Sequence, residues 1–332
     1  MIRSNPMLSI QKTETLTGEF FTIYLESLRI DIVLDFDLYI KTGRDIVLYR
    51  ACSLPFTEAT RSALLENNVD RLYVPTYEQH AYQGYIEANI DEVLDDAAIS
   101  ETVKAGIVYD SSTLLVKDIF NNPALGDNIK RSQAMVESTV SFVLKGQNAF
   151  HNLLDVMSFN YSTYTHSVNV CTFSLALAQF TGINDTEALN QLGTGALLHD
   201  VGKTKIPESV LMKRGSLTES EMEQIRMHPQ WGFEIIKRTD LISKASYYPV
   251  IQHHEREDRS GYPDGLSASG IHPYSKIVAI ADVFDAITTE RVYRRAVDTF
   301  PALMTMYAER STFDQQLLEQ FTKLMGPTNL TG

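Results

Sequence analysis

The chain has 332 residues, which is longer than a typical single compact domain, so we expect two domains. It is 44% hydrophobic and 21% charged, as in an ordinary globular protein, and no apolar run is long enough to cross a bilayer. The formal net charge of -13 argues against binding to DNA or RNA polymers or to an anionic membrane. Any phosphate ligand must therefore be held by local positive charge.

The start of the chain and its cysteines bear on the cellular compartment. The segment before Phe20 has no apolar stretch followed by a small-residue cleavage site, so it does not resemble a secretory signal. Cys52 and Cys171 belong to no CxxC pair, which argues against a disulfide framework and against a thiolate zinc site. A cytoplasmic location is the expectation.

The first part of the chain mixes strand and helix signals. Between residues 35 and 50, two alternating apolar runs flank Thr42-Gly43-Arg44, which predicts a β-hairpin. A helix is predicted from Thr57, followed by a strand at residues 71–74. These elements predict a small α+β module.

After Pro75 the apolar spacing becomes helical and stays so until the segment NNPALGDN at residues 121–128. Beyond it, strand signals are rare, so we expect an all-α domain. The predicted division is residues 1–125, an N-terminal regulatory or sensor module with a helical connector, and residues 126–332, a catalytic domain. The connector segment, residues 78–120, is either a dimer stalk or packing within the chain.

Five of the eight histidines lie between residues 166 and 254, and each one alone is more consistent with a structural or solvated histidine than with a ligand. His199 lies at the end of an apolar helix and is followed by Asp200, a carboxylate that is costly to bury unless it is paired or bound to metal. Because a carboxylate has two oxygens and can bridge two cations, Asp200 is the candidate bridge of a dinuclear site. The ordered series on separate helices is the specific signal: His166, His199 with Asp200, His228, His253 with His254, and Asp282.

This series, with HDVGK at residues 199–203, HHE at 253–255 and GYP at 261–263, resembles the HD-GYP family of bacterial cyclic di-GMP phosphodiesterases. The resemblance covers residues 129 to about 321 and implies an all-α HD-domain helical bundle. It also implies that all seven residues of the series are metal ligands. Some members of the family carry a glutamate one turn before the first histidine, which helps to hold a third metal. Here that position is Ser162, a poor ligand, so we expect two metal ions rather than three.

The resemblance also implies residues that bind the substrate. It places phosphate-binding groups at Arg291 and Arg294, with a solvated basic face as the plain alternative. Lys203 is assigned to a non-bridging phosphate oxygen from its position four residues after His199, with an exposed lysine at a helix end as the alternative. Tyr262 belongs to a loop over the site, and the GYP segment is also an ordinary turn signature. Asp285 is a candidate contact to a guanine edge.

The implied reaction is hydrolysis of cyclic di-GMP to pGpG, and slowly on to GMP, by a hydroxide that bridges two cations. One alternative is a cyclic di-GMP receptor with little turnover, and another is a phosphohydrolase for a different nucleotide. Iron or manganese is the family's expectation, and zinc, nickel or magnesium also suit these ligands. The family alone suggests GGDEF-domain proteins as partners at the GYP loop.

Overall fold

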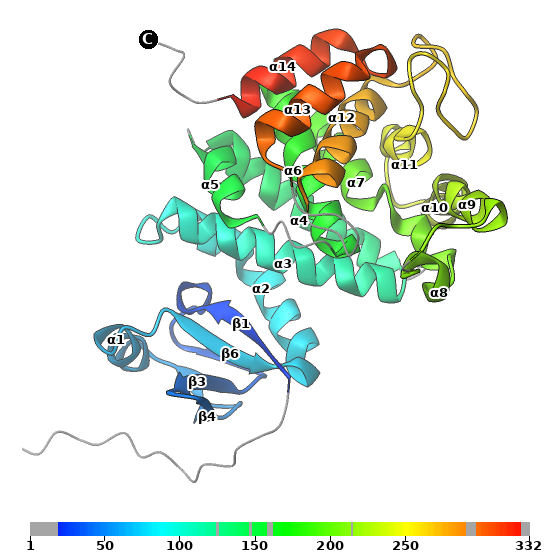
Figure 1. Ribbon diagram of the computed structural model, residues 1–332. Helices are drawn as coiled ribbons and strands as arrows, with labels where there is room; N and C mark the ends of the chain where they lie inside the picture. The colour runs from blue at the N-terminus through cyan, green and yellow to red at the C-terminus, as the bar shows by residue number, and fades with distance from the viewer. Residues whose placement is uncertain are drawn as a thin grey trace, which may run out of the picture. The chain divides into compact units, whose positions relative to one another are not determined.

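The computed structural model describes residues 19–123, 126–145, 148–157, 162–213, 215–289 and 297–326. The chain divides into two compact units, residues 1–107 and 108–332 (Figure 1). The boundary between these units lies inside helix α3 (Glu101–Asn121), whereas the sequence places the domain boundary at residue 125. The division into a regulatory or sensor module before residue 126 and a catalytic domain after it stays a prediction.

The first unit is the expected α+β module. A four-stranded antiparallel sheet has the order β1-β6-β3-β4, and a separate pair joins β2 to β5. The strands are β1 (Phe20–Tyr24), β2 (Ile32–Val33), β3 (Leu38–Thr42), β4 (Asp45–Arg50), β5 (Pro55–Phe56) and β6 (Arg71–Pro75). Its helices are α1 (Glu58–Glu66) and α2 (Gln79–Asp95).

Two local predictions for this unit are confirmed. β3 and β4 form a hairpin whose turn contains Gly43 at φ 66°, a conformation that glycine adopts without steric cost. Helix α1 begins after Thr57, whose side chain accepts a hydrogen bond from the backbone N–H of Thr60. α2 then buries Ile86, Ile90 and Val93, which are spaced to lie on one helix face.

The described part of the second unit contains helices and no strand, which confirms the all-α prediction. The helices after α3 are α4 (Gly126–Lys145), α5 (Ala149–Val156), α6 (Thr163–Phe180), α7 (Thr186–Leu198), α8 (Glu208–Leu211), α9 (Glu219–Arg226), α10 (His228–Lys237), α11 (Tyr247–Gln252), α12 (Pro273–Thr288), α13 (Thr299–Ala308) and α14 (Gln315–Met325). A short 3-10 helix, η3 (Val201–Lys205), links α7 to α8.

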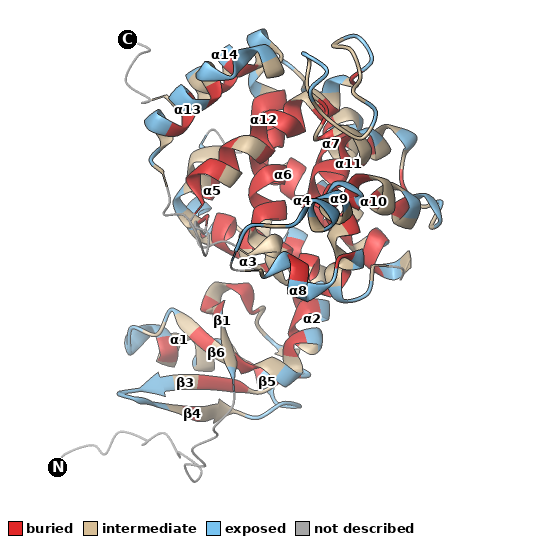
Figure 2. Cartoon of the chain, turned by 45° about the vertical axis from the view of Figure 1, so that its right-hand side comes forward, coloured by how far each residue is buried: buried red, intermediate tan, exposed pale blue. Residues whose placement is uncertain are grey.

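Helices α6 and α12 form the centre of this unit, and Figure 2 shows their buried residues in red. α6 is buried on all sides from His166 to Ala178, including its polar residues Ser167, Asn169, Thr172 and Ser174. Phe173 of α6 packs edge-on against Phe284 of α12 with ring centroids 5.2 Å apart, and Phe321 of α14 completes the group. α6 and α12 are far apart in sequence, and they carry the metal-ligand candidates His166 and Asp282, respectively.

Candidate metal centre

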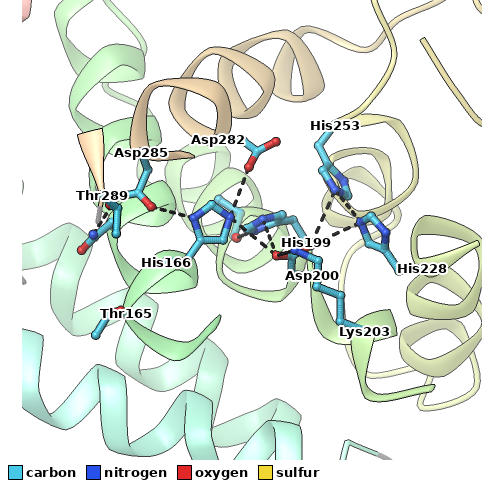
Figure 3. Close-up of polar contacts among 12 residues, drawn as sticks. Thr165, His166, His199, Asp200, Lys203, His228, His253, Asp282, Asp285 and Thr289 are labelled. Carbon is cyan, nitrogen blue, oxygen red and sulfur yellow. Dashed lines mark hydrogen bonds and ion pairs between the residues drawn. The ribbon is translucent and has the colours of Figure 1, made fainter. Parts of the chain in front are cut away.

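The histidines and aspartates of the predicted series meet at one place in the helical unit, and Figure 3 labels all of them except His254. His166 lies in the first turn of α6, His199 caps the end of α7 and Asp200 follows it. Asp282 comes from α12. His228 begins α10, and His253 and His254 follow α11. Except for His254, all of these residues are buried, so their polar atoms need partners.

A glycine in the HDVGK segment allows α10 to approach this site. A Cβ atom added to Gly202 would lie 1.9 Å from the carbonyl oxygen of His228 and 2.5 Å from the backbone nitrogen of Gly232. Only glycine leaves room for this backbone contact. The contact holds His228 against the His199-Asp200 pair.

The ligand atoms fall into two groups of three, and Asp200 faces both. One group is His166, His199 and Asp200, and the other is His228, His253 and His254. Asp200 Oδ2 lies 3.5 Å from His166 Nε2 and 3.4 Å from His199 Nε2. Asp200 Oδ1 lies 3.2 Å from His228 Nε2 and 3.9 Å from His253 Nε2. Each oxygen of one carboxylate thus points to a different group, as in a bridging ligand.

Asp282 also lies between the two groups, which the sequence did not indicate. Its Oδ1 is 3.2 Å from His166 Nε2, and its Oδ2 is 3.8 Å from His254 Nδ1. Two carboxylates therefore face both sets of imidazoles.

Hydrogen bonds fix the tautomer of three of the imidazoles. Nδ1 of His199 lies 2.7 Å from the carbonyl oxygen of Ala196, and Nδ1 of His228 lies 2.7 Å from that of Ile225. Nδ1 of His253 lies 2.9 Å from the carbonyl oxygen of Pro249. Because a carbonyl only accepts, each Nδ1 carries the proton and each Nε2 keeps a lone pair for a metal.

The donor atoms fit divalent cations. His228 Nε2 and His253 Nε2 face each other at 3.1 Å, although both are lone-pair acceptors once their Nδ1 atoms donate. Among the described residues, His199 Nε2 and Asp200 Oδ1 are buried without a hydrogen-bond partner. Divalent cations held by the two groups would satisfy these atoms, so the residues present suit a metal centre.

The pKa values of the buried histidines and aspartates decide which of them can bind a metal at neutral pH. Burial lowers the pKa of His254 to about 3 and the pKa of His253 well below its ordinary value. Burial alone raises the pKa of Asp200, but Lys203 and His199 outweigh it and hold the pKa well below the ordinary value. Burial alone lowers the pKa of His166, but Asp282 and Asp285 outweigh it and raise the pKa to about 10. Ionised carboxylates beside neutral imidazoles are the forms that bind metal, so His253 and His254 are ready as ligands, whereas His166 must lose a proton when a cation binds.

Asp285 lies on the far side of His166 from the ligand cluster. It is fully buried, its Oδ2 is 2.6 Å from His166 Nδ1, and its Oδ1 accepts hydrogen bonds from Asn169 and Thr289. Asn169 in turn accepts a hydrogen bond from the Tyr109 hydroxyl of α3. Both oxygens of Asp285 are engaged inside the protein, so this geometry contradicts the assignment of Asp285 to a guanine edge. It orients His166 instead.

Lys203 reaches the ligand cluster from η3, although the chain there forms a 3-10 helix rather than a continuation of α7. Its Nζ lies 2.5 Å from Asp200 Oδ2.

Ser162 is the N-cap of α6, where its hydroxyl accepts from the backbone N–H of Thr165 at 3.1 Å. The absence of a third metal stays a prediction. Arg291 and Arg294 lie outside the described residues.

The GYP loop covers the side of the centre formed by His254. The ring of Tyr262 stacks on the imidazole of His254, with centroids 4.6 Å apart. A Cβ atom on Gly261 would lie 2.4 Å from the His254 carbonyl oxygen, so only glycine fits. Glu255 is buried, and its carboxylate accepts from the backbone N–H groups of Asp264 at 2.7 Å and Leu266 at 2.9 Å. Glu255 belongs to the HHE motif, but the sequence alone does not indicate that it anchors this loop.

Comparisons with known proteins agree with this geometry. A family model described as an HD domain matches residues 152–317. The chain is 32% identical over 69% of its length to a cyclic di-GMP phosphodiesterase of Pseudomonas aeruginosa, and 39% identical over 43% to a cyclic di-GMP phosphodiesterase response regulator of Xanthomonas campestris. It is 35% identical over 48% of its length to a 3'3'-cGAMP-specific phosphodiesterase of Vibrio cholerae. The chain spans 56%, 38% and 36% of these relatives, respectively.

A solved structure described as an HDG"Y"P protein from Bdellovibrio bacteriovorus aligns with a TM-score of 0.65, covering 92% of this chain and 99% of that one. At 22% identity this likeness concerns the fold alone. Among the described residues, no helix is long and apolar enough to span a membrane. The motifs, the ligand geometry and the family match lead to one conclusion: the chain belongs to the HD domain family, in its HD-GYP type.

Proposed function

We propose that the chain is a metal-dependent phosphodiesterase that hydrolyses cyclic di-GMP to linear pGpG, with slower conversion on to GMP. The observation that carries the proposal is the position of the Asp200 carboxylate, whose two oxygens face two separate sets of imidazoles. When bound there, two divalent cations supply Lewis-acid activation of water and of the scissile phosphodiester.

The residues around the cations have separate tasks. Asp200 and Asp282 each extend between the two histidine groups and hold them at a fixed separation. The Nδ1 hydrogen bonds lock the imidazoles of His199, His228 and His253 with Nε2 toward the centre. The site is thereby organised before the substrate arrives, which lowers the reorganisation needed during the reaction.

Positive side chains next to the carboxylates suit a phosphate group. The Lys203 side chain is 18% exposed beside Asp200, so its ammonium can contact both the centre and a non-bridging phosphate oxygen. Arg291 and Arg294 are proposed to hold phosphate oxygens as well, on the family resemblance alone. In a chain with a net charge of -13, such local positive charge is what concentrates an anionic substrate.

The remaining assignments rest on the family resemblance. We propose iron or manganese as the metals, with zinc, nickel or magnesium as the alternatives to be separated by metal analysis. GGDEF-domain proteins at the GYP loop remain a prediction of the same kind. A homodimer through the helical connector and a cytoplasmic location remain predictions from the sequence. The names of the relatives give the receptor alternative no support, because those quoted are phosphodiesterases.

The test is incubation of metal-loaded protein with cyclic di-GMP, followed by chromatography of the products. We expect pGpG to appear first and GMP later. Tight binding of cyclic di-GMP without any product contradicts the enzyme and supports the receptor. Product formed equally well by His199→Ala shows that the reaction uses another site.

A further inference from the structure

A cavity of about 600 Å³ opens beside the metal centre, between helices α9 and α10 and the GYP loop. Its lining includes Glu223, Arg226, Gln230, Tyr262 and Pro263. The volume lies in the range of small-molecule sites. Tyr262 is the shared wall, because its ring stacks at 4.6 Å on the metal-ligand candidate His254. A substrate with its phosphate at the metals can therefore extend a base into this cavity.

The cavity contains polar groups without partners. Arg226 is exposed, and it forms no salt bridge or hydrogen bond with any described residue. Its guanidinium carbon lies 5.8 Å from the centroid of the Tyr262 ring, within the range of a cation–π contact. The guanidinium thus lies beside the Tyr262 ring at the cavity, and its N–H groups donate to no described residue.

Gln230 supplies a second unsatisfied group. Its Oε1 is buried and has no hydrogen-bond partner among the described residues, which is a costly arrangement for an amide. Because the amide can rotate about its last bond, it can present either its oxygen or its NH₂ group to a ligand. Glu223 adds a carboxylate at the exposed edge of the same cavity.

We propose that this cavity is a guanine-binding subsite, in which Arg226 donates to O6 and N7 of the base while Gln230 and Glu223 accept from its N1–H and amino groups. This inference rests on the proposed function and identifies the base that the site selects. Guanine offers two neighbouring acceptors that match the fork of an arginine, whereas adenine offers N7 beside an amino donor. The face of the Tyr262 ring provides a stacking surface for either base.

The proposed subsite predicts which cyclic dinucleotides the chain hydrolyses. Cyclic di-AMP has no guanine, so its hydrolysis should be slower than that of cyclic di-GMP and independent of Arg226. 3'3'-cGAMP has one guanine and is accepted in one of its two orientations. This prediction matters because the chain is similar both to a phosphodiesterase named for cyclic di-GMP and to one named for 3'3'-cGAMP.

The test compares kcat/KM for cyclic di-GMP and cyclic di-AMP in the metal-loaded full chain and in Arg226→Ala and Gln230→Leu. Arg226→Ala should lower kcat/KM for cyclic di-GMP by roughly tenfold to a hundredfold, because a good bidentate contact to guanine discriminates by that amount. The loss should appear mainly in KM, since the base contact is made in the ground state and the transition state alike. Hydrolysis of cyclic di-AMP should hardly change. Gln230→Leu should likewise lower kcat/KM for cyclic di-GMP and leave kcat/KM for cyclic di-AMP nearly unchanged.

Two controls separate the possible failures. Arg238→Ala removes an exposed arginine at the other end of α10 and should leave all rates unchanged. Bis(p-nitrophenyl) phosphate, which has no base, reports on the metal centre and should be hydrolysed by Arg226→Ala as by the original chain. An equal loss with all three substrates, or no loss with any, overturns the guanine subsite.

If the original chain hydrolyses no cyclic dinucleotide, the proposed function fails, and the subsite is then tested by calorimetric titration with 5'-GMP and 5'-AMP. Tighter binding of 5'-GMP that is lost in Arg226→Ala supports the subsite on its own. Equal binding of the two nucleotides contradicts it.

Discussion

Asp285 Oδ2 lies 2.6 Å from His166 Nδ1, on the opposite side of the imidazole from the nitrogen that faces Asp200 and Asp282. A carboxylate behind a metal-binding histidine fixes the ring orientation and raises its basicity as a ligand. Asn169 holds the second oxygen of Asp285 at 2.7 Å, so the carboxylate itself cannot rotate freely. The arrangement connects α6 and α12 through one buried polar network.

Asp285→Asn should lower activity without removing a ligand. We expect a loss of roughly 10- to 100-fold in kcat or in metal affinity, the range for outer partners of metal ligands. Metal titration and steady-state kinetics on cyclic di-GMP measure the two effects. Asp298→Asn, an exposed aspartate without a side-chain capping bond, is the matched control and should behave like the original chain. An Asp285→Asn protein with unchanged metal affinity and kcat contradicts the positioning role.

Asp200→Asn should have a larger effect than Asp285→Asn, because it changes the carboxylate that faces both histidine groups. An amide offers one neutral oxygen and cannot replace an ionised bridging ligand. Metal content by mass spectrometry should fall and hydrolysis should be lost. Two tightly held metals per chain in Asp200→Asn contradict the bridging assignment.

Removing the metals should destabilise the helical unit, because His228 Nε2 and His253 Nε2 then face each other at 3.1 Å with nothing between them. A ligand at a hundredfold excess over its Kd stabilises the fold by about 2.7 kcal/mol, which for a unit of this size is a rise of roughly 5–10 °C in Tm. Thermal unfolding with and without a chelator measures the change, and adding the metal back should reverse it. An unchanged Tm speaks against a metal held in this cluster.

Ser162→Glu tests the expected number of metals. Ser162 caps α6 one turn before His166, so a glutamate there adds a carboxylate on the side of the first histidine group. We expect two metals per chain in the original protein and up to three in the variant, measured by mass spectrometry. Ser162→Ala separates the capping role, and should cost about 1 kcal/mol of stability without changing the metal count. Three metals in the original chain contradict the expectation.

Gly202→Ala should damage the site through the backbone. Its Cβ atom would lie 1.9 Å from the His228 carbonyl oxygen, so α10 must move away from η3. We expect a loss of about 2 kcal/mol or more in the free energy of unfolding, together with weaker metal binding. Urea denaturation measures the first effect. Gly215→Ala, where an added Cβ meets no described atom within 4 Å, should be close to neutral.

The sequence by itself determined the elements and the ligand types. Gly43 predicted the hairpin turn, and Thr57 predicted the start of α1. Both predictions succeed because a turn glycine and a helix N-cap depend only on residues next to them in the chain. The His199-Asp200 pair at a helix end indicated metal, because an isolated buried carboxylate is too costly to keep.

Only the tertiary structure decided which residues meet. Asp285 has the residue type of a guanine contact, yet it contacts His166, a residue 119 positions away, because α6 packs against α12. The approach of Gly202 to α10 and the anchoring of the GYP loop by Glu255 have the same origin. Helical spacing fixes which side chains share a face of one helix, but not which face of another helix lies against it.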